Sequence, residues 1–241
     1  MTDRPGRPLL FFDIDDTLVD HRSAEEAAQR ETFETYRTLL AGLAFDDWLA
    51  TYRAKNRPLW DAYGRGEITR EVLQHRRFLD PLEALGRDAA RADEVGDYYL
   101  SRYREHWRLN EGAEEALDAA SRYGFVGLLS NGFVEQQQGK VARLGLGRWS
   151  RAVILSEEVG AMKPDRRIFE AAVEAARLAG AGEFGRRIYV GDSWVHDIVG
   201  ARGAGWEAVL YNPSGAESPG PVPEIRSLPE IRAHLFDTVS R

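Results

Sequence analysis

Short apolar runs recur along this chain and alternate with longer amphipathic stretches, and this alternation most limits what the chain can fold into. The runs lie at 9–12, 125–130, 152–156, 187–192 and 206–212. Between them the sequence follows the helical period, as in "EGAEEALDAASRYG", where acidic residues come early and a glycine comes last. Strands that alternate with helices pair in parallel. We therefore predict an α/β fold with a doubly wound, mostly parallel, Rossmann-like sheet.

A long interval separates the first apolar run from the second. Strand-like runs vanish there, and charged, aromatic-bearing helical segments such as "AEEAAQRETFETYRTLLAG" replace them. We predict that residues 20–109 form a helical cap domain inserted after the first strand, and that residues 1–19 and 110–241 form the α/β core. Three tryptophans fall in the insertion and are expected in its own core: Trp48, Trp60 and Trp107.

Composition excludes several classes of protein. The 241 residues include 39 acidic and 32 basic side chains, so the net charge is −7, and no Lys/Arg cluster suits a nucleic-acid polymer. The chain has no cysteine, which excludes disulfides and thiolate metal sites. No apolar stretch has the length of a signal-peptide core or a membrane span. We expect a cytoplasmic protein with neither nucleic acid nor membrane as a partner.

Polar and charged residues follow the apolar runs. In an open α/β sheet, ligands bind beyond the carboxyl ends of the strands, so residues that follow different strands meet at one edge. Acidic groups that are buried there need a positive partner, because an unpaired buried carboxylate costs several kcal/mol. The candidate site residues are, in chain order, Asp13, Asp15, Thr17, Ser130, Asn131, Lys163, Asp192 and Asp197.

These residues resemble the motifs of the haloacid dehalogenase (HAD) superfamily, in its phosphohydrolase branch. Four motifs match in chain order: DxDxT at 13–17, a strand-end serine at Ser130, the lysine of a Lys-Pro pair at Lys163, and GDxxxxD at 191–197. DxDxT alone would be a weak signal, whereas four motifs in order, each after an apolar run, form a specific one. The resemblance covers nearly the whole chain and implies a HAD-type core with a cap.

The resemblance also implies a role for each residue. Asp13 would attack phosphorus and form an aspartyl-phosphate, and Asp15 would protonate the leaving oxygen and then activate water. Mg²⁺ would be held by the Asp13 side chain, the Asp15 backbone carbonyl and Asp192, with Asp197 in support. Because side chains alternate along a strand, the chain must turn at 14–16 for both aspartates to reach one phosphate. The phosphoryl group would be bound, or stabilised during catalysis, by Thr17, Ser130, Asn131 and Lys163.

Electrostatics explains why such a site needs a metal ion. A carboxylate at about 4 Å from a phosphate dianion meets a repulsion of about 4 kcal/mol per charge pair at an effective dielectric of about 20, roughly 8 kcal/mol in total. That energy corresponds to about six decades of rate. A divalent cation between the two groups removes this penalty, so Mg²⁺ is the expected cofactor.

The substrate is predicted from similarity to a narrower group. The stretch 52–78, together with "SNGFVEQQQGKVARLGL" and "LSEEVGAMKPD", looks like the bacterial pyrimidine 5′-nucleotidase subgroup. This similarity implies a phosphomonoester hydrolase that acts on pyrimidine (deoxy)nucleoside monophosphates, as a monomer or homodimer. The alternative is a phosphatase or phosphomutase acting on a sugar phosphate or another small phosphate ester. Candidate contacts to base or sugar are His21, Arg22, Asn56, Arg57, Trp60, His75 and Arg76.

Two other classes fit the sequence less well. A dehalogenase of the same fold would gain nothing from an acid at Asp15, so the DxD pair argues against it. A two-component receiver domain also combines acids, a hydroxyl and a lysine on a doubly wound sheet. Its phosphoacceptor lies on a later strand, and it carries no helical insertion.

Overall fold

The computed structural model describes residues 6–236 and divides into two compact units. The first unit contains residues 6–20 and 108–236, and the second contains residues 21–107. The second unit therefore interrupts the first in sequence shortly after the first strand.

The first unit is built on a six-stranded sheet in the order β3-β2-β1-β4-β5-β6, in which every pair of neighbours is parallel. The predicted α/β class, with a doubly wound sheet and a helical insertion after the first strand, is confirmed. The strands are β1 (Leu9–Phe12), β2 (Phe125–Ser130), β3 (Val153–Leu155), β4 (Arg187–Gly191), β5 (Glu207–Tyr211) and β6 (Glu224–Ile225).

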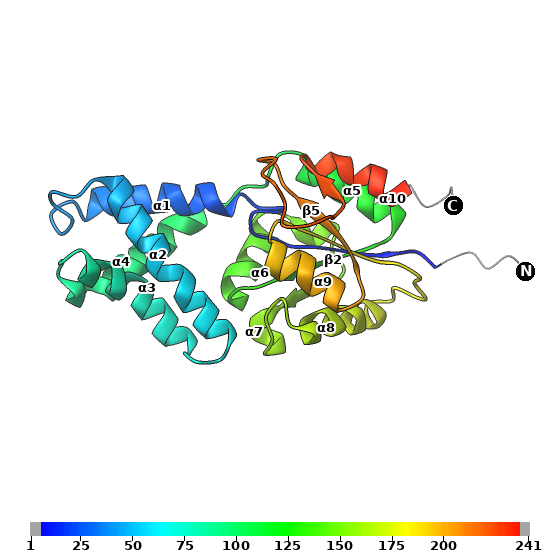
Figure 1. Ribbon diagram of the computed structural model, residues 1–241, viewed down its shortest axis with the longest axis horizontal. Helices are drawn as coiled ribbons and strands as arrows, with labels where there is room; N and C mark the ends of the chain where they lie inside the picture. Colours follow the sequence, from blue (N-terminus) through cyan, green and yellow to red (C-terminus); the bar gives the residue numbers. More distant parts are fainter. Residues whose placement is uncertain (1–5, 237–241) are drawn as a thin grey trace, which may run out of the picture. The chain divides into compact units, whose positions relative to one another are not determined.

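Strand β1 lies in the middle of this sheet, between β2 and β4. All four of its residues are fully buried, with Leu10 and Phe12 in one hydrophobic cluster and Leu9 and Phe11 in the other. The sequence of such a strand is apolar throughout because helices cover both faces of the sheet. Figure 1 shows α5 (Ala113–Tyr123) and α10 (Ile231–Phe236) on one face, and α8 (Arg166–Leu178) and α9 (Gly200–Gly203) on the other.

Shorter elements complete the first unit around the strand ends. They are α6 (Val134–Arg143) and η2 (Leu146–Arg148) after β2, α7 (Ser156–Val159) after β3, and η4 (Leu228–Glu230) before α10. Strand β4 leads into a π-helical segment, η3 (Trp194–Val199). Short π-helical segments often occur at functional sites, and this one contains the last aspartate of the fourth sequence motif.

The second unit consists of four helices and one 3₁₀ turn: α1 (His21–Thr35), α2 (Phe45–Gly64), α3 (Arg70–Ala84), η1 (Ala89–Arg91) and α4 (Ala92–Glu105). Its core is aromatic, and the rings of Tyr52, Phe78 and Tyr99 lie 5.3 to 5.8 Å apart. Trp48 and Trp107 are buried, as expected, whereas Trp60 is half-buried.

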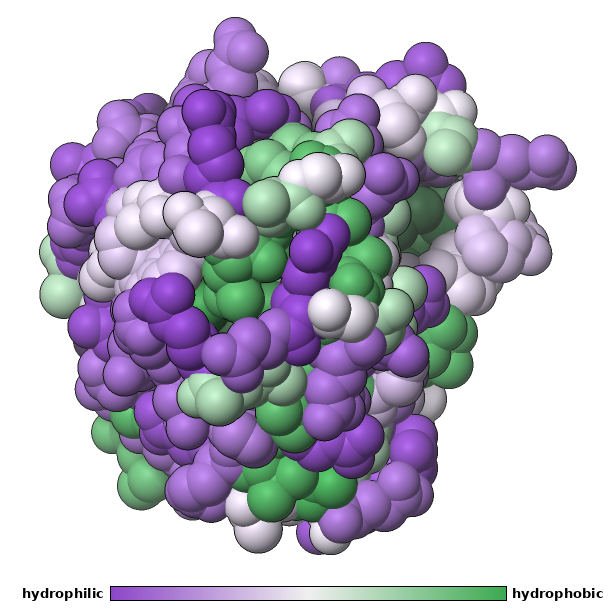
Figure 2. Space-filling view, turned by 90° about the vertical axis from the view of Figure 1, so that its left-hand side faces the viewer, coloured by the Kyte–Doolittle hydropathy of each residue, from purple (hydrophilic) through white to green (hydrophobic). Residues whose placement is uncertain are grey.

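The outer surface of the helical unit is charged. The face turned toward the viewer in Figure 2 is largely hydrophilic, with apolar side chains gathered in small patches. This pattern fits helices that bury one stripe and expose the other. Within residues 6–236, no helix is both long and apolar enough to span a bilayer.

Candidate active site

The predicted site residues gather at the carboxyl ends of β1, β2 and β4 and in the loop after α7. A cavity of about 140 Å³ lies there. Thr17, whose fully buried side chain lies in the turn after β1, is the one predicted residue that does not line the cavity. The lining residues are Asp13, Asp15, Ser130, Asn131, Lys163, Asp192, Ser193, His196 and Asp197.

The turn after β1 brings two aspartates to this cavity. β1 ends at Phe12, Asp16 adopts a left-handed φ of 59°, and the Asp16 amide donates to the Val19 carbonyl at 2.8 Å. Aspartate is among the few residues other than glycine that tolerate this backbone conformation. The chain thus leaves the strand where the sequence analysis predicted, and Asp13 and Asp15 both line the cavity.

A buried lysine neutralises part of the negative charge. Lys163 Nζ donates to Asp13 Oδ1 at 2.6 Å, to Asp197 Oδ1 at 2.7 Å and to the Tyr189 hydroxyl at 2.9 Å. An ammonium group has three N–H donors, so these contacts use all of them. In this arrangement Lys163 acts as a counter-charge to the carboxylates, with no N–H left for the phosphate contact that the sequence analysis expected.

The backbone of residue 163 is fixed by Asn131. The Asn131 side-chain amide donates to the Lys163 carbonyl at 3.0 Å, and its oxygen accepts from the Lys163 amide at 2.8 Å. Asn131 was expected to bind phosphate directly. Both ends of its side chain instead hold the segment that carries the lysine.

Three carboxylates form a group that suits a hard cation. Oxygen atoms of Asp13, Asp192 and Asp197 all lie within 4.8 Å of one another. Asp197 is fully buried, with Oδ1 bound to Lys163 and Oδ2 accepting from the Ser193 amide at 2.8 Å. Asp13 and Asp192 are therefore better placed than Asp197 to bind a cation, because both oxygens of Asp197 already accept hydrogen bonds.

Two acid groups in this cluster, Asp13 and Asp192, have raised pKa values. Burial raises the pKa of Asp13 above its ordinary value, Lys163 partly offsets that rise, and the charge of Asp197 adds to it. Burial also raises the pKa of Asp192, and repulsion from Asp13 and Asp197 raises it further. One lysine does not balance these carboxylates. Carboxylate oxygens that lack enough positive charge are the donor set that Mg²⁺ requires, so the residues fit the expected ion.

Two hydroxyl groups in this region have no partner among the residues that the structure describes: Ser130 Oγ and Thr17 Oγ1, both buried. Ser130 also lines the cavity. A buried hydroxyl without a partner costs free energy. Ser130 is thus available to donate a hydrogen bond to an oxygen of a bound phosphoryl group.

Besides Ser193 of the cavity lining, three residues that bind the charged groups of this site were not predicted from the sequence. Tyr189, inside β4, accepts from Lys163 and donates to the Leu129 carbonyl at 2.8 Å. Gln137 and Lys140, on α6, both bind the Asp15 carboxylate, at 2.7 Å and 2.5 Å. None of them follows a strand end, so the strand-end rule could not find them. Lysine occurs in this chain at only three positions, 55, 140 and 163, and that scarcity was the available signal for Lys140.

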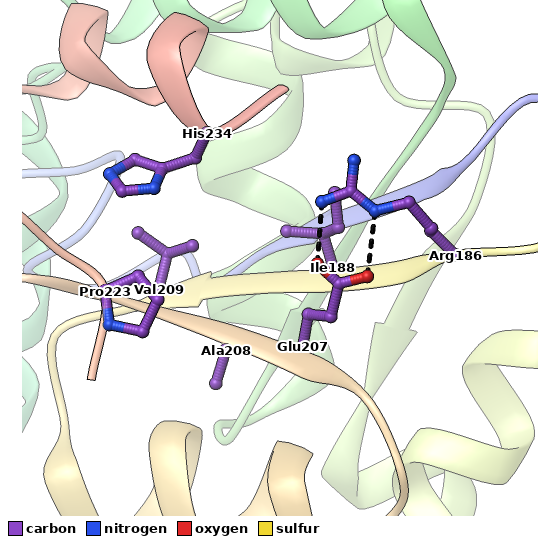
Figure 3. Close-up of a pocket in the computed structure, with 7 residues that line it drawn as sticks. All are labelled: Arg186, Ile188, Glu207, Ala208, Val209, Pro223 and His234. Carbon is purple, nitrogen blue, oxygen red and sulfur yellow. Dashed lines mark hydrogen bonds and ion pairs between the residues drawn. The ribbon is translucent and has the colours of Figure 1, made fainter. Parts of the chain in front are cut away.

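A second cavity, of about 180 Å³, lies at the opposite edge of the sheet, where β4 and β5 begin (Figure 3). Its two charged residues are bound to each other, with Arg186 Nη2 donating to Glu207 Oε2 at 2.7 Å. His234 of α10 also lines it. Because this arginine is already paired with a carboxylate, the cavity suits a phosphate poorly.

Comparison with known proteins identifies the family. The sequence model of the haloacid dehalogenase-like hydrolases matches residues 8–205, a range that contains every residue of the candidate site. The chain belongs to this family. The predicted resemblance and the predicted hydrolase class are thereby confirmed.

Individual relatives match over nearly their whole length. Pyrimidine 5′-nucleotidase YjjG of Escherichia coli (strain K12) is 32% identical over 229 residues, which cover 94% of this chain and 96% of YjjG. Ribulose-1,5-bisphosphate 5-phosphatase of Halopiger xanaduensis is 29% identical over 241 residues, or 95% of each chain. The crystal structure of the HAD-hydrolase YfnB from Bacillus subtilis, bound to magnesium, has a TM-score of 0.81 at 28% identity and covers 95% of this chain and 99% of its own.

Proposed function

We propose that this HAD-family phosphatase is a Mg²⁺-dependent 5′-nucleotidase that acts on pyrimidine (deoxy)nucleoside monophosphates through an aspartyl-phosphate at Asp13. The observation that carries the mechanism is the arrangement around Asp13. This carboxylate lines a cavity, is held by a buried lysine and lies in a carboxylate cluster that needs more positive charge. These features favour a nucleophile whose repulsion from phosphate is offset by the site.

The contacts support a role for each group in the first step of the proposed reaction. Lys163 engages Oδ1 of Asp13, which leaves Oδ2 to attack phosphorus. The new bond joins this oxygen to phosphorus, and the bond from phosphorus to the ester oxygen breaks. Asp15, which must be protonated for this step, gives its proton to the departing oxygen, and Ser130 donates a hydrogen bond to a phosphoryl oxygen. The second step reverses the role of Asp15, which takes a proton from the water that hydrolyses the aspartyl-phosphate.

The metal site of this proposal consists of Asp13, Asp192 and the backbone carbonyl of Asp15. A Mg²⁺ ion held there would supply the positive charge that offsets repulsion between the carboxylate and the phosphate. Asp197 and Lys163 hold the surrounding groups in place. The magnesium-bound YfnB structure, with the same fold at 28% identity, supports this choice of ion.

The substrate class rests on the relatives. YjjG, which matches almost the whole chain at 32% identity, supports a pyrimidine nucleotide. The ribulose-1,5-bisphosphate phosphatase, at 29% identity, supports a sugar phosphate as the second candidate. Both share the chemistry at Asp13, so the two candidates differ only in the group attached to the phosphate.

The test is phosphate release from a panel of nucleoside monophosphates and sugar phosphates, with and without Mg²⁺. Turnover that requires Mg²⁺, is greatest on UMP, dUMP or dTMP and is lost in Asp13→Asn would support the proposal. Turnover greatest on sugar phosphates would replace the substrate and keep the mechanism. Absence of Mg²⁺-dependent turnover on every ester would overturn both. Asp165→Asn is the matched control, because Asn can also cap α8.

A further inference from the structure

Helix α6 buries polar side chains where a helix normally buries apolar ones. Its fully buried residues are Gln137 and Lys140, which are 2% and 1% exposed. A helix packed on a core ordinarily turns an apolar stripe inward. Burying an ammonium group costs several kcal/mol unless a partner of opposite charge is in place. The two buried residues therefore require a specific partner.

That partner is one carboxylate, and each of its oxygens receives its own donor. Lys140 Nζ lies 2.5 Å from Asp15 Oδ1, and Gln137 Nε2 lies 2.7 Å from Asp15 Oδ2. Residues three apart on a helix lie on the same face, so one turn of α6 presents both donors together. A carboxylate held at both oxygens cannot rotate about its own axis without breaking one of the two bonds.

The chain leading into α6 leaves room for this arrangement. A Cβ atom at Gly132 would lie only 2.6 Å from Gln137 Nε2, so any larger residue would displace the amide. The Gln137 backbone amide donates to the Phe133 carbonyl at 3.0 Å, which fixes its position in the first turn. Both the glycine and the helix turn thus place Gln137 against Asp15.

Asp15 remains accessible from the cavity. Its side chain is 25% exposed and lines the cavity together with Asp13, whereas Lys140 is buried and does not line it. The two aspartates of the first motif therefore have separate lysines. Lys163 binds Asp13, and Lys140 binds Asp15 from the side of α6.

We propose that Lys140 and Gln137 are positioning residues that fix the orientation of the Asp15 carboxyl group, which gives a proton to the leaving oxygen and later takes one from the attacking water. This inference rests on the proposed function, in which Asp15 serves both chemical steps. Neither residue touches the substrate, and both act through Asp15. A misdirected proton donor or acceptor slows the reaction even when it is present, because proton transfer requires close alignment of the reacting atoms.

Asp15 is needed for the departure of a nucleoside and for the attack of water, but not for the departure of p-nitrophenolate. Departure of a nucleoside needs a proton because an alkoxide is a poor leaving group, whereas p-nitrophenolate leaves readily without one. In Lys140→Met, we expect the initial burst of p-nitrophenolate to keep its rate. Steady-state turnover of p-nitrophenyl phosphate and of UMP should each fall by about 10- to 100-fold, because water attack on the aspartyl-phosphate still needs Asp15.

Three further variants exclude a general structural effect. Lys140→Arg should restore part of the lost rate, and Lys55→Met, on an exposed position of α2, should have none of these effects. In an Asp15→Ala background, Lys140→Met should cause no additional loss, because its effect passes through Asp15. Gln137→Leu should reproduce the pattern of Lys140→Met with a smaller loss.

Several outcomes would overturn the positioning role. They are unchanged UMP turnover in Lys140→Met, an equal loss in the p-nitrophenolate burst, or a further full loss in the Asp15→Ala background. A crystal structure of Lys140→Met gives a readout that does not depend on activity, and an Asp15 carboxylate in its original orientation would also contradict the proposal. If wild-type turnover is lost in Asp13→Asn but not in Lys140→Met, the proposed function stands and only the positioning role fails.

Discussion

Lys163 Nζ lies 2.6 Å from Asp13 Oδ1, and both side chains are buried. Burial alone would lower the pKa of Lys163, but attraction to Asp13 and Asp197 raises it above its ordinary value, so the ammonium stays charged. The same contact opposes the rise in the pKa of Asp13. This pair therefore keeps the proposed nucleophile closer to its reactive, ionised form.

Replacing Lys163 with methionine should damage both stability and activity. Asp13 and Asp197 would lose their shared counter-charge, and breaking a buried ion pair costs about 3 to 5 kcal/mol of unfolding free energy. We expect a loss of this size in urea unfolding at neutral pH, and a fall of at least about 100-fold in kcat/KM. Lys55→Met is the matched control, and equal stability of the two variants would contradict this role of Lys163.

Tyr189→Phe should affect Lys163 more gently. The change removes the hydroxyl that accepts from Lys163 and donates to the Leu129 carbonyl, while the ring stays packed against Phe169. Loss of these hydrogen bonds should lower the unfolding free energy by about 1 to 3 kcal/mol. Because Tyr189 does not line the cavity, kcat should fall with little change in KM.

The control for this prediction is Tyr36→Phe, which removes a hydroxyl bound to Glu94 in the helical unit. Urea unfolding and steady-state kinetics on the best ester check both variants. A Tyr189→Phe protein with a raised KM and an unchanged kcat would show that the hydroxyl acts on substrate binding instead.

Mg²⁺ should stabilise the protein more at high pH than at low pH. The pKa values of Asp13 and Asp192 are raised above the ordinary 3.8, so the folded protein without metal holds protons that the unfolded chain has released. The contribution of these two carboxyl groups to the unfolding free energy is fully present below their pKa in the unfolded chain. It is lost as the pH rises through their raised pKa in the folded protein. A bound cation reverses this loss, because it favours the ionised carboxylates.

Thermal unfolding with and without Mg²⁺ at about pH 5.5 and about pH 8.5 measures this difference. We expect a larger rise in Tm at the higher pH, where fewer protons compete with the ion. Asp192→Asn should remove most of the rise at both pH values. A rise in Tm that is equal at the two pH values would indicate that the ion binds elsewhere.

The sequence predicted the parts of this site that follow a simple rule. A buried parallel strand is an apolar run, and the polar residue after it lies at the edge where ligands bind. This rule located Asp13, Ser130 and Asp192, and the family motifs added Lys163. It placed Thr17 in the same group, but the turn after β1 buries that side chain away from the cavity.

The remaining contacts could not be predicted because they depend on packing between elements distant in sequence. Gln137 and Lys140 look like the polar face of a surface helix until α6 is packed beside Asp15, more than a hundred residues earlier. Tyr189 looks like an ordinary aromatic residue of a buried strand until its hydroxyl meets Lys163. Periodicity predicts which face of an element is buried, but not which group on another element it meets.

Gly191→Ala should disturb the site through sterics alone. A Cβ atom at residue 191 would lie 2.4 Å from the carboxyl carbon of Asp197, so this side chain would have to move. Because Asp197 binds Lys163 and the Ser193 amide, its displacement should propagate to both. We expect a loss of about 1 to 3 kcal/mol in unfolding free energy, together with reduced kcat.

Gly147→Ala is the matched control, since a Cβ atom there meets no atom within 4 Å and the residue does not need a left-handed backbone. That variant should be neutral or up to about 1 kcal/mol more stable, and equal effects of the two substitutions would show that the close approach at Gly191 does not constrain the site.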